Sequence, residues 1–341
     1  MIRAKKVLAA ALATGLLLCG CGAEGEEVIE PVVPNVEEAT EYMDSVEIEV
    51  EVPTSYTFMR TGEEYGEIVE ATYYSTTCEK DRPVNIVLPV GYDEDKSYPV
   101  LYVLHGIFCD QTTMMNSNST HIVIQNMIKD GLAKDMIIVF PYIYASKEHD
   151  TCAEISVETS AEYDNFLNDL VTDLMPYMAE NYAVAQGKKN TAVLGFSMGG
   201  REALAIGFTY PDLFGYVGAI APAPGLVPGQ DWAMTHPGQF QNDELVFSDD
   251  IMPWLLMICC GDNDHTVGTF PKTYHELLDT NSVDHIWYEI PGSDHGDPAV
   301  LSGTYNFCKY AFGYESTAAE EPAEESFEQF ISAFTGTADK D

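Results

Sequence analysis

Basic residues are scarce in this chain. Its 341 residues include 16 Lys and Arg against 55 Asp and Glu, which gives a formal net charge of −39. The one basic cluster, Arg3, Lys5 and Lys6, lies at the extreme N-terminus. Because a nucleic-acid partner requires a face of Lys and Arg to neutralise its phosphates, the composition argues against one. The hydrophobic content of 46% is too high for a disordered chain, and the length suits one large α/β domain or two small ones.

Metal-binding motifs are also missing. The sequence contains no His-Glu-x-x-His and no Cys-x-x-Cys, so a metal-dependent hydrolase has little support, and we expect no metal and no other cofactor. The run 262–264 (DND) resembles the start of a calcium loop, but the glycine and glutamate at the required offsets are missing. His265, His275 and His285 are ten residues apart, which matches no metal pattern, and we interpret them as surface or hydrogen-bonded histidines.

The N-terminus has an apolar run, at residues 7–18, that is too short for a mature membrane span. It follows basic residues and precedes small ones, which is typical of a bacterial secretory signal over residues 1–20. The sequence Leu-Cys-Gly-Cys at 18–21 resembles the lipobox of bacterial lipoproteins, and we expect Cys21 to carry the lipid. The protein would then be exported and held on the extracellular face by its lipid alone. An ordinary signal with a chance cysteine is the alternative.

Acidic segments flank the central part of the chain. Residues 21–59 contain carboxylates and prolines but no Lys or Arg, and they are interpreted as an acidic linker. Residues 313–341 form a second acidic segment, in which Phe327, Phe330, Ile331 and Phe334 have the spacing of a short amphipathic helix. The folded domain is therefore expected over residues 60–312.

This domain alternates strand-like and helix-like segments without a repeat. Such an order predicts an α/β fold, with a mostly parallel sheet and helices on both faces. A proline at 176 falls within the apolar stripe of the helix expected at 160–182, so a kink or a boundary is expected there. The strands are expected at 84–88, 99–104, 136–140, 191–196, 216–220, 254–260 and 286–290, and the remaining helices at 199–209, 269–280 and 299–312.

The most informative motif is Gly-Phe-Ser-Met-Gly at residues 195–199. It joins an apolar strand directly to a helix-forming stretch, which is the context that a Gly-x-Ser-x-Gly nucleophile elbow requires. Glycine is needed on both sides of the serine because a side chain would collide in so tight a turn. This placement predicts that Ser197 is a nucleophile.

A nucleophilic serine needs a base and an orienting carboxylate. In α/β-hydrolase order these follow as an acid and then a histidine, and two later strands end in suitable residues. We expect His295 to be the base and Asp264 the acid; Asp262 is the competing acid, and its place directly after Gly261 suits a residue that caps the turn. The oxyanion would be bound by the backbone N–H groups of Ile107 and Met198.

Four stretches carry a family resemblance: LHGIFCD, GFSMGG, CGDNDHTVG and PGSDHG, in this order. Together they resemble the putative-esterase (esterase D-like) branch of the α/β hydrolases over about residues 66–312, and most of all the feruloyl and acetyl-xylan esterase modules attached to bacterial xylanases. The resemblance implies an α/β-hydrolase fold and a serine esterase that removes feruloyl or acetyl groups from plant cell-wall polysaccharide such as xylan. One departure, Ser293-Asp294-His295 where the family often has Gly-Gly-His, concerns contacts near the base.

Substrate contacts would come from long loops above the sheet. The Pro/Gly-rich loop 222–253 contains Trp232 and Phe240 as candidate walls of an acyl pocket, although a lid that packs on itself fits the sequence equally well. Cys109 and Cys152 are candidates for a disulfide. The alternative functions are a general short-chain esterase or an acyltransferase on the same triad, or a carbohydrate-binding surface lipoprotein without turnover.

Overall fold

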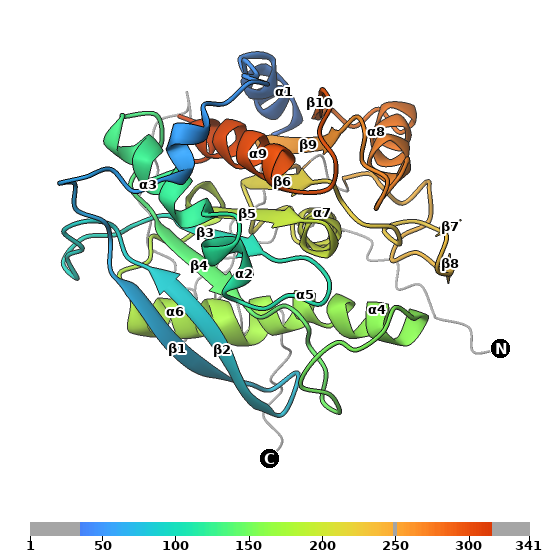
Figure 1. Ribbon diagram of the computed structural model, residues 1–341. Coiled ribbons are helices and arrows are strands. Elements are labelled where there is room, and N and C mark those ends of the chain that lie inside the picture. Colours follow the sequence, from blue (N-terminus) through green and yellow to red (C-terminus); the bar gives the residue numbers. More distant parts are fainter. Residues whose placement is uncertain (1–34, 248–250, 316–341) are drawn as a thin grey trace, which may run out of the picture. The chain divides into compact units, whose positions relative to one another are not determined.

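The computed structural model describes residues 35–247 and 251–315. The predictions for the signal peptide, Cys21 and the helix of the C-terminal tail lie outside these residues. An eight-stranded sheet forms the centre, in the order β1-β2-β4-β3-β5-β6-β9-β10 (Figure 1). Its strands are β1 (Ile68–Ser75), β2 (Lys80–Val87), β3 (Val100–Leu104), β4 (Ile137–Pro141), β5 (Thr191–Phe196), β6 (Tyr216–Ile220), β9 (Leu255–Gly261) and β10 (Ile286–Ile290).

The sheet is parallel from β4 to β10 and antiparallel at its other edge. Strands β3, β4, β5, β6 and β9 are entirely or almost entirely buried, as their continuous apolar runs predict for strands covered on both faces. The edge strand β1 is not predicted by the sequence, because exposed and polar residues interrupt its apolar pattern. It pairs antiparallel with β2, and β2 pairs antiparallel with β4.

Helices cover both faces of the sheet. Gly207 of α7 packs on Val217 of β6, whereas the next residue, Gly218, faces Phe307 of α9. Because neighbouring residues of a strand point to opposite faces, α7 and α9 lie on opposite faces (Figure 1). The helices are α1 (Val36–Asp44), α2 (Thr113–Asn116), α3 (Thr120–Lys129), α4 (Val157–Asp164), α5 (Phe166–Asp169), α6 (Met175–Asn181), α7 (Met198–Thr209), α8 (Phe270–Thr280) and α9 (Asp297–Tyr310), with 3-10 turns at Thr54–Thr57 and Lys188–Asn190.

The helix expected at 160–182 is broken into pieces. A π-helical turn, Leu170–Leu174, separates α5 from α6, and Pro176 lies in the first turn of α6. Proline has no N–H to donate to the fourth residue before it, and its ring crowds that carbonyl, so the wider turn accommodates it. The interruption predicted at Pro176 is therefore present. None of the helices in the described parts of the chain is long and apolar enough to cross a membrane.

The acidic linker prediction is wrong for residues 35–59. Helix α1 buries Ala39 and Met43, and the Asn35 side chain exchanges two hydrogen bonds of 2.8 and 2.9 Å with the backbone of Met252. In the extended segment that follows, apolar and acidic residues alternate, and the apolar ones pack against the core: Val46, Ile48, Val50 and Val52. Apolar residues therefore recur at every second position, which is the pattern of an extended segment with one buried face. The glutamates between them gave the segment the composition of a solvated linker.

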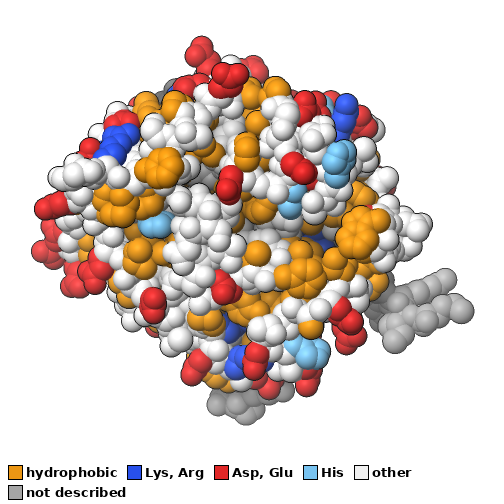
Figure 2. Space-filling view, in the orientation of Figure 1, with side chains coloured by type: hydrophobic (Ala, Val, Ile, Leu, Met, Phe, Trp, Pro, Cys, Tyr) orange, Lys and Arg blue, Asp and Glu red, His pale blue; other side chains and the backbone are white. Residues whose placement is uncertain are grey.

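The folded part also extends beyond residue 312. The Tyr314 ring stacks on Trp254, just before β9, with centroids 4.5 Å apart and an angle of 11° between the planes. Acidic side chains are spread over the face drawn in Figure 2, with few Lys or Arg among them, so the negative charge is not confined to one patch there.

Candidate active site

Ser197 lies in a strained turn between β5 and α7. Its φ of +57° and ψ of −116° fall outside the regions that non-glycine residues usually adopt, which is typical of residues that a turn holds in place for function. A Cβ added to Gly195 would lie 1.9 Å from the carbonyl oxygen of Gly199, and one added to Gly199 would lie 2.4 Å from that of Leu104. Only glycine fits at either position.

The loops after β9 and β10 bring Asp264 and His295 together. His295 Nδ1 lies 2.7 Å from Asp264 Oδ2, and the other carboxylate oxygen accepts the backbone N–H groups of Thr266 and Val267 at 2.9 and 3.1 Å. Burial raises the pKa of Asp264, but the hydrogen bonds from His295 and these amides prevail and hold the pKa below its ordinary value. Asp264 is therefore an anion that fixes the proton of His295 on Nδ1.

The competing acid, Asp262, has a different partner. Its Oδ1 accepts the N–H of Gly292 at 2.6 Å, so Asp262 joins its own turn to the loop that precedes His295. The arrangement places Asp264, and not Asp262, against the imidazole.

The His295 ring also lies against the residue that precedes the serine. Its centroid is 4.6 Å from that of Phe196, so the imidazole sits over the end of β5. Among the described residues, no hydrogen bond reaches the Ser197 Oγ. Contacts between a nucleophile and its base are often long before substrate binds.

The loop after β3 lies directly against Ser197. A Cβ on Gly106 would be 3.4 Å from the Ser197 Cβ and 3.8 Å from its Oγ. The N–H of Ile107 belongs to this loop, and the N–H of Met198 begins α7. The two predicted oxyanion donors therefore lie on backbone segments beside the nucleophile.

His105 fixes the orientation of this loop. Its ring is buried, its Nε2 lies 3.0 Å from the N–H of Ile143, and its Nδ1 lies 2.7 Å from the carbonyl oxygen of Gly106. Because the Ile143 N–H can only donate, Nε2 accepts, so Nδ1 carries the proton and donates it to Gly106. The Gly106 carbonyl and the Ile107 N–H belong to one planar peptide, so this hydrogen bond also sets the direction of that N–H.

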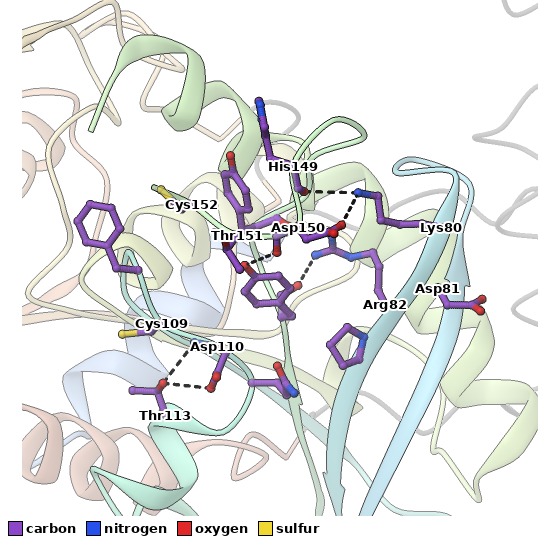
Figure 3. Close-up of a pocket in the computed structure, with 15 residues that line it drawn as sticks. Lys80, Asp81, Arg82, Cys109, Asp110, Thr113, His149, Asp150, Thr151 and Cys152 are labelled. Carbon is purple, nitrogen blue, oxygen red and sulfur yellow. Dashed lines mark hydrogen bonds and ion pairs between the residues drawn. The ribbon is translucent and has the colours of Figure 1, made fainter. Parts of the chain in front are cut away.

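A cavity of about 480 Å³ extends from the same loop (Figure 3). Phe108, the residue after Ile107, lines it and is 54% exposed, and two tyrosines, Tyr142 and Tyr144, line it from the loop after β4. Cys109 and Cys152 both line it, and both are free thiols, so the disulfide considered between them is not formed.

Arg82 holds one wall of this cavity. Its guanidinium donates to the carbonyl oxygens of Tyr142 and Tyr144, the latter at 2.8 Å. The ion pair with Asp169, at 3.1 Å, compensates the charge of Arg82, since both side chains are almost completely buried. The β4 loop therefore has a fixed backbone where it borders the cavity.

A largely buried ionic cluster supports the helix that follows Ser197. Arg201 of α7 pairs with Glu202 and with Asp164 of α4, and burial raises the pKa of Glu202 to about 7. Gln239 donates to both carboxylates, at 2.6 Å to Asp164 and 3.0 Å to Glu202. Because Gln239 belongs to the loop 222–253, the cluster joins that loop to the nucleophile helix.

The two aromatic candidates of this loop lie in different surroundings. Trp232 is 77% exposed and lies between β7 (Gly229–Gln230) and β8 (Thr235–His236), which pair as a small hairpin. The Phe240 ring packs edge-on against Phe208 of α7, with centroids 6.0 Å apart. Neither lines the cavity of Figure 3. Phe240 therefore contributes to the packing of the loop against α7.

The N-terminal segment contributes to a second cavity. This cavity, of about 500 Å³, is lined by Val50, Val52 and Phe58 on one side and by Asp297 and Pro298 on the other. Asp297 lies two residues after His295, so residues that resembled a linker border the loop of the candidate base.

The site combines a serine elbow, an Asp–His pair and a loop with backbone donors. All three lie at the carboxyl ends of parallel strands, and this arrangement defines an α/β hydrolase. A family model described as "Putative esterase" matches residues 75–255, and the chain belongs to this family. The predicted fold and family are thus confirmed, and the chain is a serine carboxylic-ester hydrolase.

Two relatives are similar in sequence. A ferulic acid esterase from Anaeromyces mucronatus, solved in complex with ferulic acid, is 45% identical, with a TM-score of 0.76 over 79% of this chain and 99% of that one. An endo-1,4-beta-xylanase/feruloyl esterase of Xylanibacter ruminicola is 27% identical over 60% of this chain. The matched part is only 26% of the length of that protein.

A third relative is similar in fold. The feruloyl esterase module of Clostridium thermocellum is 17% identical and has a TM-score of 0.60. The match covers 82% of this chain and 99% of the module.

Proposed function

We propose that this protein is a feruloyl esterase that releases hydroxycinnamoyl groups from plant cell-wall polysaccharide such as xylan. The observation that supports it best is the 2.7 Å contact between His295 and Asp264 beside the Ser197 elbow. It occurs in a chain 45% identical to a ferulic acid esterase along nearly the whole of that enzyme. Acetyl esters are the second candidate substrate, because the same catalytic groups act on any acyl group that fits.

The reaction follows from the position of each group. His295 Nε2 takes the Ser197 proton as Oγ attacks the ester carbonyl, and the amides of Ile107 and Met198 bind the developing oxyanion. Asp264 keeps the proton of His295 on Nδ1 and stabilises the imidazolium. His295 then returns its proton to the leaving alcohol, which leaves an acyl group on Ser197. Water attacks this acyl-enzyme in the same manner and releases the acid and free serine.

We propose that the substrate extends from Ser197 into the cavity beside the oxyanion loop. The exposed Phe108 and the tyrosines of the β4 loop supply aromatic walls, which suit a phenolic ring. Trp232, which lies in the hairpin of β7 and β8, is a further candidate contact. A Phe108→Ala variant should lower kcat/KM for methyl ferulate more than for p-nitrophenyl acetate. A loss confined to a feruloylated oligosaccharide would instead assign the cavity to the sugar.

The central experiment measures hydrolysis by the full chain and by its Ser197→Ala variant. Methyl ferulate and p-nitrophenyl acetate are the two substrates. Equal activity in the variant, or none in the wild type on either ester, would overturn the mechanism. Activity on acetate alone would move the proposal to an acetyl or short-chain esterase, and acyl transfer to an added alcohol would indicate an acyltransferase. Saccharide binding without turnover would favour the non-catalytic lipoprotein.

We also propose that the protein is exported and anchored through a lipid on Cys21. The basic start, the short apolar run at 7–18 and the Leu-Cys-Gly-Cys sequence support this proposal. Expression in a bacterial host with a radioactive fatty acid should label the wild type and not a Cys21→Ala variant. Label retained in the variant would contradict the assignment.

A further inference from the structure

Two histidines and an aspartate meet between α8 and β10, away from the candidate active site. His275 and Asp279 lie one turn apart on α8, and His285 lies immediately before β10. One ligand atom of each side chain lies within 4.8 Å of the other two. Strand β10 is the edge of the sheet, and Figure 1 shows α8 beside it.

The backbone orients His285 toward His275. The Nδ1 of His285 lies 2.8 Å from the carbonyl oxygen of Val283. A carbonyl only accepts, so Nδ1 carries the proton and the lone pair of His285 is on Nε2. That nitrogen lies 2.8 Å from Nδ1 of His275. A histidine whose second nitrogen donates to a backbone carbonyl is typical of a metal ligand, because the contact fixes both the tautomer and the ring.

The His275 ring is held by a neighbouring aromatic side chain. It stacks on Trp287 of β10, with centroids 5.2 Å apart and 7° between the planes. Its Nε2 lies 3.6 Å from Asp279 Oδ2. With the His275 proton on Nδ1, the contact with His285 is an ordinary hydrogen bond; with that proton moved to Nε2, toward the carboxylate, Nδ1 has a lone pair directed at the lone pair of His285. Two such lone pairs 2.8 Å apart require a proton or a cation between them.

We propose that His275, Asp279 and His285 bind a divalent transition-metal ion such as Zn²⁺. The ligands are Nδ1 of His275, Nε2 of His285 and a carboxylate oxygen of Asp279, and water completes a tetrahedron. Bonds of about 2.0–2.1 Å place the two nitrogens roughly 3.3 Å apart, so the rings need to separate by only about 0.5 Å. The Asp279 side chain is 62% exposed and free to rotate inward. Imidazole ligands disfavour Ca²⁺ and Mg²⁺, which take oxygen ligands.

Such an ion would connect two elements, α8 and β10, that adjoin the loops of the candidate acid and base. Helix α8 follows the loop of Asp264, and β10 precedes the loop of His295. The ion would therefore hold these elements together at the ends remote from the chemistry. This inference does not depend on the proposed ester substrate.

Titration of the full chain with Zn²⁺ by isothermal calorimetry tests the proposal. The wild type should show one site with a dissociation constant in the micromolar range, which excess Mg²⁺ or Ca²⁺ leaves unchanged. His275→Gln and His285→Gln should each weaken it at least tenfold, and Asp279→Asn less. His149→Gln, which removes an exposed imidazole elsewhere, is the matched control. All cysteines remain in every variant, so zinc bound to thiols contributes equally.

A second measurement uses Trp287. Cu²⁺ at the site should quench part of the tryptophan fluorescence, and a large excess of Zn²⁺, which binds such ligands less tightly than Cu²⁺, should reverse the quenching. The exposed Asp279→Asn variant guards against loss of folding in the histidine variants, whose circular dichroism is compared with the wild type. No binding tighter than millimolar in the wild type, or unchanged affinity in folded His275→Gln and His285→Gln, would overturn the proposal.

Discussion

His105 offers a direct test of how the oxyanion loop is oriented. The amide nitrogen of asparagine can take the place of Nδ1 and donate to Gly106, but asparagine cannot reach the N–H of Ile143. Glutamine can place its oxygen where Nε2 accepts from Ile143, but it leaves the Gly106 carbonyl with only the longer hydrogen bond from the Cys109 N–H, at 3.4 Å. Each substitution removes one of the two hydrogen bonds, of 2.7 and 3.0 Å, and keeps the other.

The two variants should be destabilised to a similar extent. Each removes the short hydrogen bond of one backbone group beside a buried side chain, which costs about 1–3 kcal/mol. Their catalytic effects should differ, because only the bond to Gly106 fixes the peptide that contains the Ile107 N–H. Complete loss of an oxyanion donor lowers kcat by about 10²–10³. We therefore expect a fall of roughly ten- to a hundredfold in His105→Gln and less than about threefold in His105→Asn.

The assay pairs steady-state kinetics on methyl ferulate with urea unfolding. KM should change little in either variant, since the oxyanion forms only in the transition state. If both variants lose the same fraction of kcat at equal stability, His105 acts through packing alone and the reasoning about the peptide plane is wrong.

Three further predictions follow from named contacts. Asp264→Asn should lower kcat by a factor of about 10⁴, because asparagine no longer fixes the imidazole tautomer, whereas Asp262→Asn should lower kcat less than about tenfold. An equal fall of kcat in the two variants would contradict the assignment of the acid. Burial lowers the pKa of His105 to about 4, so the unfolded chain takes up a proton below pH 6.5 while the folded chain does not. The free energy of unfolding should therefore fall by about 3 kcal/mol from pH 7 to pH 4 on this account, and His105→Asn should flatten the dependence measured by urea unfolding at each pH. A chain that starts at residue 35 should melt as the full chain does, whereas one that starts at residue 60 should melt at a clearly lower temperature, because it lacks Met43, whose truncation to Ala alone costs about 2–5 kcal/mol.

The central strands and the elbow could be predicted because their signals are local. A fully apolar run followed by a glycine turn identifies both a buried strand and its carboxyl end, and in a parallel sheet such ends meet. That is why Ser197, Asp264 and His295 could be selected from three separate strands, and the structure brings Asp264 and His295 into contact.

The features that could not be predicted from the sequence depend on tertiary contacts. The segment 46–52 alternates valine or isoleucine with glutamate, and its net charge resembled that of a solvated linker. His275 and His285 have no periodic relation, since their contact is created by the return of the chain from α8 to β10. The surroundings of Trp232 and Phe240 depend on the course of a long loop, which composition does not determine.

The two ends of the folded part have a consequence for presentation of the active site. Asn35 binds Met252 and Tyr314 stacks on Trp254, so both ends meet the body just before β9, at the amino ends of the parallel strands. Ser197 and the Asp264–His295 pair lie at the carboxyl ends, across the sheet. The side of the sheet that carries the catalytic groups is therefore clear of both ends of the described chain.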